Sequence, residues 1–237
     1  MKEITFIIPC AGKGSRLGIP FPKEMFPIDK EMTLIDKCFE NLKQFKDICQ
    51  IVIIISKEKE ELVKYLSKYS DEFNIYFVYQ KTYYKELIGA IKSAEDFFLE
   101  KNVIILPDIL INDENLEMKL HHYINILNYQ DYSFLITHET DKNILSKVGN
   151  VIVFNNKIID AIDKPDIYTI NQLDLSHYWV SIAFKKDSDF FNFFNDLQKN
   201  KTMIELNRSI NYDYSEIDFA LDLGVWQNIE KFYKIKR

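Results

Sequence analysis

The first half of the chain contains three short apolar runs, at residues 4–9, 51–55 and 103–106. Each run is continuous and rich in β-branched residues, which is typical of strands buried on both faces of a parallel sheet. Between them, apolar residues recur at helical spacing over residues 33–45, 57–69 and 85–99. This alternation of strand and helix predicts βαβ units that build a parallel sheet covered by helices.

The second half of the chain has a different pattern. Residues 151–154, 157–162 and 178–184 read as strands, and Asn155-Asn156 is a plausible tight turn between the first two. Helical spacing returns over residues 188–200 and 215–234. Because no Pro/Gly/Ser-rich linker, repeat or low-complexity tract interrupts the chain, we expect one α/β domain over residues 1–237 with a partly antiparallel insertion.

Composition and charge narrow the functional classes. Of the 237 residues, 47% are hydrophobic and 28% charged, which indicates a globular chain with a sizeable core. The net charge of -6 argues against a nucleic-acid partner, although local basic clusters could serve a small anionic substrate. The three cysteines predict neither a disulfide framework nor a zinc site. With no signal peptide or membrane-spanning stretch recognised, we expect a cytoplasmic protein with no membrane partner.

The loop after the first predicted strand holds the densest set of candidate functional residues. It runs Pro9-Cys10-Ala11-Gly12-Lys13-Gly14-Ser15-Arg16-Leu17-Gly18, with Pro22-Lys23-Glu24 shortly after. Two glycines at the carboxyl end of a buried strand allow a tight bend that brings backbone N–H groups against phosphate oxygens. Arg16 and Lys23 add cationic donors suited to a triphosphate. From these residues alone, an ordinary strand-to-helix turn with solvated basic side chains is an equal alternative.

Two well-known phosphate loops fail on spacing. A dinucleotide-binding fingerprint needs a third glycine where Leu17 stands, and a Walker A loop needs Gly-Lys-Ser/Thr at its end. A third pattern fits. The loop followed by Phe21-Pro22-Lys23-Glu24-Met25-Phe26-Pro27 resembles the G-x-G-(S/T)-R-(M/L)…P-K-x-(L/M)-x-P motif of the sugar-1-phosphate nucleotidylyltransferases. That resemblance implies a Rossmann-like, mostly parallel sheet sandwiched by helices, with a small, partly antiparallel acceptor-side insertion. It also implies that the loop (Ala11, Gly12, Lys13, Gly14, Ser15 and Arg16) and Lys23 bind the NTP.

Further segments follow the family's order almost to the end of the chain. Gln80, before Leu87-Ile88-Gly89-Ala90, resembles the position that reads the base edge, although Glu86 stands where the family usually has Gly. Asp108 ends the strand Val103-Ile104-Ile105-Leu106-Pro107 and resembles the family's nucleotide- and Mg²⁺-binding Asp. Asp222, in Asp222-Leu223-Gly224, resembles a second Mg²⁺ ligand. Taken without the family, Gln80 reads better as a surface residue, Asp108 equally well as a cap or turn former, and Asp222 as a possible helix cap.

The resemblance also implies an acceptor site. Asp163-Lys164-Pro165 resembles the E-K-P motif in which the Lys holds the acceptor phosphate, with Asp163 replacing Glu. Ser181 stands where the family usually has Gly. Arg16, Lys23 and Lys164 are therefore the expected catalytic residues, Asp163, Lys164 and Ser181 the expected acceptor set, and Asp108 with Asp222 the expected ligands of Mg²⁺ or Mn²⁺.

The expected activity is transfer of a nucleoside monophosphate from an NTP to a small phosphorylated acceptor, with release of pyrophosphate. The compact chain and altered acceptor side resemble small cytidylyltransferases of capsule biosynthesis, including one acting on L-glutamine phosphate, which favours CTP as donor. A sugar-1-phosphate thymidylyl- or uridylyltransferase is the first alternative, and a non-catalytic nucleotide-binding relative is the second. The sequence leaves open whether the protein forms a homo-oligomer.

Overall fold

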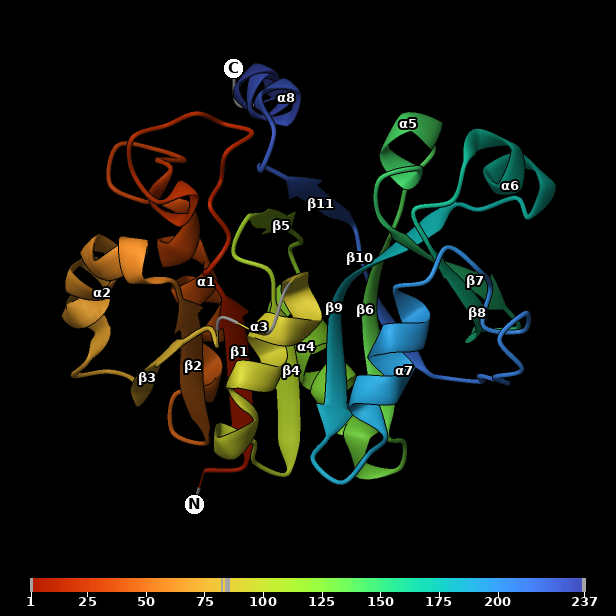
Figure 1. The fold of residues 1–237 in the computed structure, drawn as a ribbon, viewed down its shortest axis with the longest axis horizontal. Coiled ribbons are helices and arrows are strands. Elements are labelled where there is room, and N and C mark those ends of the chain that lie inside the picture. Colours follow the sequence, from red (N-terminus) through yellow and green to blue (C-terminus); the bar gives the residue numbers. More distant parts are fainter. Residues whose placement is uncertain (1, 82, 84–85, 236–237) are drawn as a thin grey trace. The chain divides into compact units, whose positions relative to one another are not determined.

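The computed structural model describes residues 2–81, 83 and 86–235, and the chain divides into two compact units. Unit 1 comprises Met1–Ile111 and Ala220–Arg237, and unit 2 comprises Asn112–Phe219. The fold is mixed α/β with a mostly parallel central sheet flanked by helices (Figure 1), as the sequence predicts.

Four parallel strands form the sheet of unit 1, in the order β4-β1-β2-β3. They are β1 (Ile4–Pro9), β2 (Cys49–Ile55), β3 (Ile75–Tyr79) and β4 (Lys101–Ile105). Ile7 of β1 is paired with Val52 on one side and Ile104 on the other, and all three side chains are fully buried. Three of these strands confirm the predicted apolar runs, whereas β3, which is only half-buried, was not predicted.

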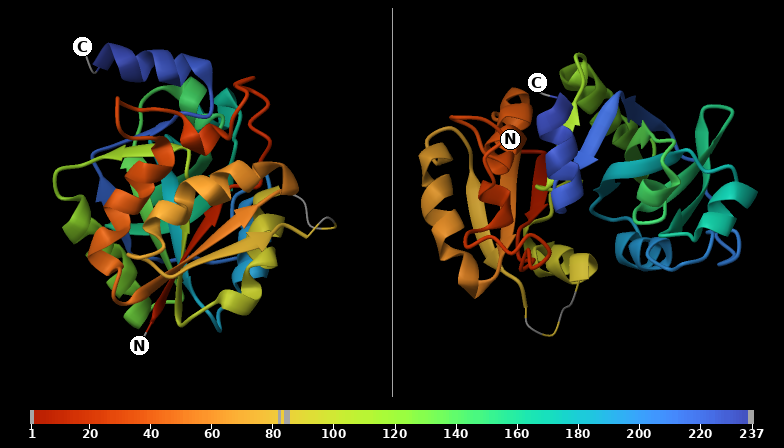
Figure 2. Two further views of the ribbon diagram at one scale, coloured as in Figure 1. Left: turned by 90° about the vertical axis from the view of Figure 1, so that its left-hand side faces the viewer. Right: turned by 90° about the horizontal axis from the view of Figure 1, so that it is seen from above.

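The helices that lie between β1 and β4 follow the predicted segments, but each predicted segment also contains 3-10 turns. The α-helices are α1 (Leu34–Leu42), α2 (Glu60–Leu66) and α3 (Glu86–Ser93), and the 3-10 turns are η2 (Lys43–Phe45), η3 (Lys57–Lys59), η4 (Ser67–Tyr69) and η5 (Glu95–Phe97). Lys85, where the third helix was predicted to begin, lies outside the described residues. Helices α1 and α3 lie on opposite faces of the strands (Figure 2).

The strand order creates a switch point beside β1. The chain passes from β1 outward to β2 and β3, and then returns to β4 on the other side of β1. In open α/β sheets, ligands bind outside the carboxyl ends of the strands at such a reversal. The segments that follow β1 and β4 are those that carry the glycine-rich loop and Asp108.

The C-terminal part of the chain corrects one prediction. Residues 215–234 were expected to be helical, but β10 (Tyr214–Ile217) and β11 (Phe219–Asp222) precede α8 (Trp226–Ile235). Ile217, Phe219 and Leu221 alternate with polar or small residues, and this spacing of two is the strand pattern. Strand β11 pairs with β5 (Ile109–Asn112), which was not predicted, in a separate two-stranded sheet.

Unit 2 is built around antiparallel pairs. Strand β9 (His177–Lys185) pairs with β6 (Tyr132–His138) and β7 (Gly149–Phe154), and β7 forms a hairpin with β8 (Lys157–Asp163). The predicted turn is confirmed, since Asn155 and Asn156 both have positive φ, at 48° and 58°. The helices are α4 (Leu116–Asn125), α5 (Lys142–Leu145), α6 (Ile167–Gln172) and α7 (Phe190–Leu197), with the 3-10 turn η6 (Ile126–Asn128). Helix α7 lies within a predicted helix, whereas β6 and α4 were not predicted.

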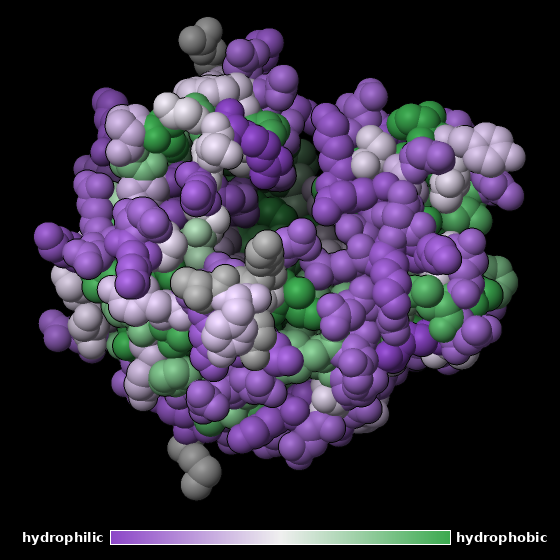
Figure 3. All heavy atoms as spheres, in the orientation of Figure 1, coloured by the Kyte–Doolittle hydropathy of each residue, from purple (hydrophilic) through white to green (hydrophobic). Residues whose placement is uncertain are grey.

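The exterior is largely polar on the face drawn in Figure 3, where apolar side chains of the described residues reach the surface in separate small patches. Cys10, Cys38 and Cys49 are free thiols and are buried. Among the described residues, no helix has the length and apolar character needed to cross a membrane.

Candidate functional site

The glycine-rich loop begins where β1 ends. The N–H of Cys10 donates to the carbonyl of Ile54 at 2.7 Å, which ties the start of the loop to β2. Gly14 has a φ of 63°, in the left-handed region that favours glycine, and its carbonyl accepts the N–H of Leu17 at 3.1 Å. No neighbouring heavy atom lies within 4 Å of the place that a Cβ on Gly12 would take. Of the other predicted residues here, Ala11 is buried, and the exposed ones are Lys13, Ser15 and Arg16.

Lys23 lies at the start of the 3-10 helix η1 (Lys23–Met25) and turns back toward the loop. A Cβ on Gly14 would meet the Cβ of Lys23 at 3.4 Å, so the two segments lie close together. The ammonium group of Lys23 forms an ion pair with Asp108. Burial lowers the pKa of Lys23, but the charge and hydrogen bond of Asp108 outweigh it and raise the pKa above its ordinary value. Lys23 is therefore held as a cation beside the loop.

Two carboxylates and a guanidinium group converge on Gly224. A Cβ on this glycine would lie 2.8 Å from Asp222 Oδ1, 3.2 Å from Asp108 Oδ2 and 3.6 Å from Arg16 Nη2. We call this arrangement of Arg16, Asp108, Asp222 and Gly224 the carboxylate cradle. Any side chain at position 224 would enter the space between the charged groups, so only glycine leaves it open.

The backbone holds the two acids of the cradle together. The N–H of Leu223 donates to the carbonyl of Asp108 at 2.8 Å, and the N–H of Gly224 donates to Asp222 Oδ1 at 2.7 Å. Burial raises the pKa of Asp222, and the charge of Asp108 raises it further. The N–H of Gly224 and the charges of Lys23 and Arg16 lower this pKa, but the raising effects are larger. A buried carboxylate whose ionised form is disfavoured by a second carboxylate is suited to binding a cation. In the described residues, no group of three or more His, Cys, Asp or Glu side chains could hold a metal, so the acids form a pair only.

Helix α8 contacts and stabilises the loop, and the sequence did not predict these contacts. The indole N–H of Trp226 donates to the carbonyl of Leu17 at 2.9 Å, and the indole packs edge-on against Phe26. The hydroxyl of Tyr233 donates to the carbonyl of Pro27 at 3.0 Å. The amide of Asn228 donates to the carbonyl of Asp222 at 2.6 Å. One helix thus contacts the segments that carry Arg16, Lys23 and Asp222.

Gln80 stands apart from the cradle within unit 1. It directly follows β3, the edge strand, which lies two strands from β1. Its backbone N–H donates to the carbonyl of Ile55 at 2.9 Å, and its side-chain amide donates to the carbonyl of Glu86 at 3.5 Å. Glu86, where the family usually has glycine, adopts a φ of 60°. The structure therefore joins Gln80 to the start of α3 and to β2.

The expected acceptor residues all lie in unit 2. Asp163 ends β8 opposite Gly149, and its carboxylate is 3.3 Å from the ammonium group of Lys164. Burial raises the pKa of Asp163, although Lys164 counteracts it. Lys164 is exposed, with a φ of 46°, and its N–H donates to the carbonyl of Val148 at 3.0 Å. Ser181 is buried, and its hydroxyl lies 2.8 Å from that of Tyr123.

Comparison with known proteins identifies a family and solved structures that resemble this chain. The family model described as nucleotidyl transferase matches residues 6–227. No curated protein matches the chain.

Solved structures share the fold over nearly the whole chain. A Bacillus anthracis protein assigned as a glucose-1-phosphate thymidylyltransferase is 21% identical, with a TM-score of 0.76 over 99% of this chain and 95% of its own. A UDP-glucose pyrophosphorylase complexed with UDP-glucose is 20% identical, with a TM-score of 0.74 over 100% of both chains. A UDP-glucose pyrophosphorylase from Acinetobacter baumannii is 16% identical, with a TM-score of 0.70 over 98% of this chain and 92% of its own.

Proposed function

The chain belongs to the nucleotidyl transferase family, and we propose that it transfers a nucleoside monophosphate from an NTP to a phosphorylated small molecule, with release of pyrophosphate. The observation that carries this proposal is the carboxylate cradle. There, two acids and Arg16 surround one point at the carboxyl end of the sheet, beside a glycine-rich loop. Such a combination of anionic and cationic groups suits a metal-bound triphosphate.

The NTP occupies the loop side of unit 1 in this proposal. Backbone N–H groups from Ala11 to Ser15 and the guanidinium group of Arg16 hold phosphate oxygens. Lys23, already a cation because Asp108 raises its pKa, turns its ammonium group from that carboxylate toward the phosphates. An oxygen of the acceptor phosphate attacks the α-phosphorus in line, and pyrophosphate leaves as the opposite bond breaks. The protein accelerates this step by positioning the groups and neutralising their charge.

Asp108 and Asp222 fit a divalent cation of the Mg²⁺ or Mn²⁺ type. Both present oxygen donors, the ligands that such hard cations prefer, and a pair of acids suffices when phosphate oxygens complete the ligand set. When bound, the cation would supply positive charge to the reacting phosphates. The raised pKa of Asp222 is consistent with this assignment, because burial and the neighbouring charge of Asp108 both disfavour its ionised form, which a bound cation would stabilise.

The acceptor side of the proposal rests on unit 2. Lys164 holds the acceptor phosphate and Asp163 accepts a hydrogen bond from the acceptor, while Ser181 shapes the site from its buried hydrogen bond with Tyr123. We further propose that residues 1–237 act as one nucleotidyltransferase domain, since the family match runs through both units.

The identities of the NTP and of the acceptor are more specific proposals than the reaction class. Gln80 has an amide that can pair with either pyrimidine, and the resemblance to capsule cytidylyltransferases favours CTP with L-glutamine phosphate. The alternative, a sugar-1-phosphate uridylyl- or thymidylyltransferase, is favoured by the activities named for the matched structures. Retention of Arg16, Lys23, Asp108, Asp222 and Lys164 weighs against a non-catalytic relative.

A pyrophosphate-release screen tests these proposals together. CTP, UTP, dTTP, ATP and GTP are each combined with L-glutamine phosphate, glucose 1-phosphate and other phosphorylated acceptors in the presence of Mg²⁺. We expect the highest kcat/KM with CTP and low activity with glucose 1-phosphate. If UTP or dTTP with glucose 1-phosphate gives the highest value, the sugar-nucleotide alternative is correct. If no combination releases pyrophosphate, the proposed activity is wrong.

A further inference from the structure

The residue that follows Lys23 forms a buried ion pair. Glu24 has 0% of its surface exposed, and Lys59, its partner, has 5%. The ammonium nitrogen of Lys59 lies 2.8 Å from each of the two carboxylate oxygens of Glu24. Burying two charges carries a desolvation cost that their attraction often only balances, so stability alone gives little reason for such a pair.

The pair links two segments that are far apart in the sequence. Glu24 lies in η1, whereas Lys59 is the last residue of η3, directly after β2. The N–H of Lys59 donates to the carbonyl of Ser56 at 3.1 Å, one residue beyond the end of β2. Lys59 therefore connects η1 to the carboxyl end of β2, a strand in which every residue except Gln50 is buried.

Lys23 and Glu24 direct their charges to different partners. Glu24 pairs with Lys59, while Lys23, its neighbour in the same short turn, pairs with Asp108 of the cradle and lies close to Gly14. The anchor on Glu24 thus fixes the backbone from which Lys23 projects. On the basis of the function proposed above, we propose that Lys59 is a positioning residue, whose pair with Glu24 holds Lys23 in reach of the NTP phosphates.

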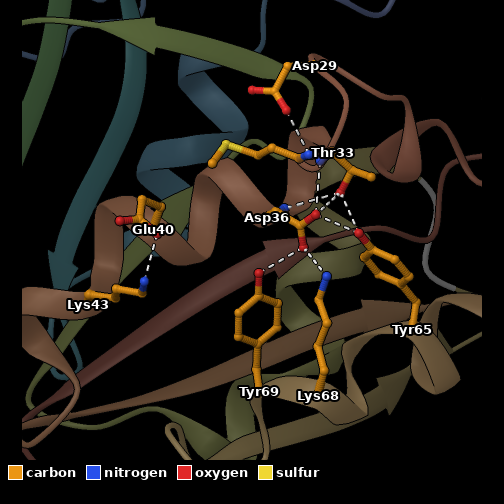
Figure 4. A network of polar contacts seen from close by, with 9 residues as sticks. Asp29, Thr33, Asp36, Glu40, Lys43, Tyr65, Lys68 and Tyr69 are labelled. Atoms are coloured by element: carbon orange, nitrogen blue, oxygen red, sulfur yellow. Dashed lines mark hydrogen bonds and ion pairs between the residues drawn. The ribbon is translucent and has the colours of Figure 1, made fainter.

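A second polar cluster of unit 1 provides a matched control. Asp36 of α1 accepts hydrogen bonds from Thr33 and, across the molecule, from Tyr65 and Tyr69, and it forms an ion pair with Lys68 (Figure 4). We call these residues the Asp36 cluster. It joins α1 to α2 and η4, but it includes neither η1 nor any residue of the cradle. We therefore expect a substitution at Asp36 to lower stability while leaving the Glu24–Lys59 ion pair in place.

The test separates positioning from stability with four proteins: wild type, Lys59→Met, the double variant Glu24→Gln/Lys59→Met, and Asp36→Asn. Lys59→Met leaves Glu24 buried and unpaired and is expected to be less stable, whereas the double variant removes both charges and regains stability. Urea unfolding gives the stability of each protein. Calorimetric binding of CTP and of UTP with Mg²⁺, together with steady-state kinetics, gives nucleotide affinity and the KM of each substrate.

We expect both Lys59 variants to bind the preferred NTP at least about tenfold more weakly than wild type, with the KM for the acceptor changed less than about twofold. Asp36→Asn is expected to lose stability while keeping wild-type NTP affinity. If instead NTP affinity follows the free energy of unfolding across all four proteins, the ion pair is only structural and the inference is wrong. A wild-type protein that neither binds an NTP nor releases pyrophosphate would contradict the proposed function instead.

Discussion

Two carboxylate clusters in unit 1 have opposite electrostatic character. In the Asp36 cluster, one acid receives donors from every side: the ammonium group of Lys68 at 2.7 Å, the hydroxyl of Tyr65 at 2.5 Å and the hydroxyl of Tyr69 at 2.8 Å (Figure 4). Although burial raises the pKa of Asp36, these donors outweigh it and lower the pKa to about 2. In the carboxylate cradle, burial and a second acid raise the pKa of Asp222.

The difference distinguishes a structural acid from a functional one. A carboxylate whose oxygens are saturated by the protein's own donors stabilises the fold and has little capacity left for a ligand. A buried carboxylate beside another carboxylate destabilises the fold, and such an arrangement marks a site that a cation completes.

The largest expected effect is on activity. Asp222→Asn should lower kcat/KM by about 10³-fold, because it removes one of the two charges that hold the cation. Asp36→Asn should change kcat/KM by less than about twofold, since its hydrogen-bond and ion-pair partners (Thr33, Tyr65, Lys68 and Tyr69) include no residue of the cradle. Steady-state pyrophosphate release measures both. If kcat/KM fell equally in the two variants, the assignment of one cluster as functional and the other as structural would be wrong.

The basic residues of the two units are expected to affect different substrates. Lys23→Ala and Arg16→Ala are expected to reduce kcat/KM for the NTP by about 10²-fold through lost phosphate contacts. Lys164→Ala should reduce it by a similar factor for the acceptor. Varying one substrate at a time separates these effects. A Lys164→Ala enzyme with a raised KM for the NTP alone would move Lys164 out of the acceptor site.

The glycine of the cradle provides a smaller, steric test. Gly224→Ala would place a Cβ 2.8 Å from Asp222 Oδ1, so one of the two groups must shift, and we expect kcat/KM to fall by about tenfold. The neighbouring Val225→Ala, which adds no atom to the cradle, is the control. Unchanged kinetics in Gly224→Ala would mean that the space between the acids is not used.

The smallest effects concern stability, and their signs differ. Asp36 has a lowered pKa, so its contribution, about 2 kcal/mol, is present above pH 4 and is lost as pH falls toward 2. Asp222 has a raised pKa, so the folded protein binds its proton more tightly and stability falls as pH rises through that pKa. At neutral pH, Asp36→Asn should therefore lower the free energy of unfolding and Asp222→Asn should raise it. Urea unfolding between pH 3 and 7 measures both signs.

The sequence predicted best what depends on local pattern. Strand β1 was predicted with its observed bounds because five consecutive buried residues form a nearly continuous apolar run. The region of β10 and β11 was predicted wrongly as helix, although Ile217, Phe219 and Leu221 alternate. Strand β6 was not predicted, because Ser133 and Thr137 interrupt an otherwise apolar run.

Contacts over long sequence separations limited the prediction of the site. Arg16, Lys23, Asp108 and Asp222 were predicted through motifs, and the structure brings these four side chains together. The hydrogen bond between Trp226 and the carbonyl of Leu17 spans 209 residues, and no local pattern signals it. The Glu24–Lys59 pair is equally hidden, since both residues read as ordinary surface charges in the sequence.

The metal dependence of pyrophosphate release tests the role of the cradle most directly. Wild type, Asp108→Ala and Asp222→Asn are assayed with the best substrate pair while Mg²⁺ or Mn²⁺ is titrated, and again in excess EDTA. We predict that wild-type activity rises with metal concentration and disappears in EDTA, and that both variants stay nearly inactive at every concentration while unfolding as cooperatively as wild type. Full turnover by Asp108→Ala in excess EDTA would contradict the assignment of the cradle as the metal site.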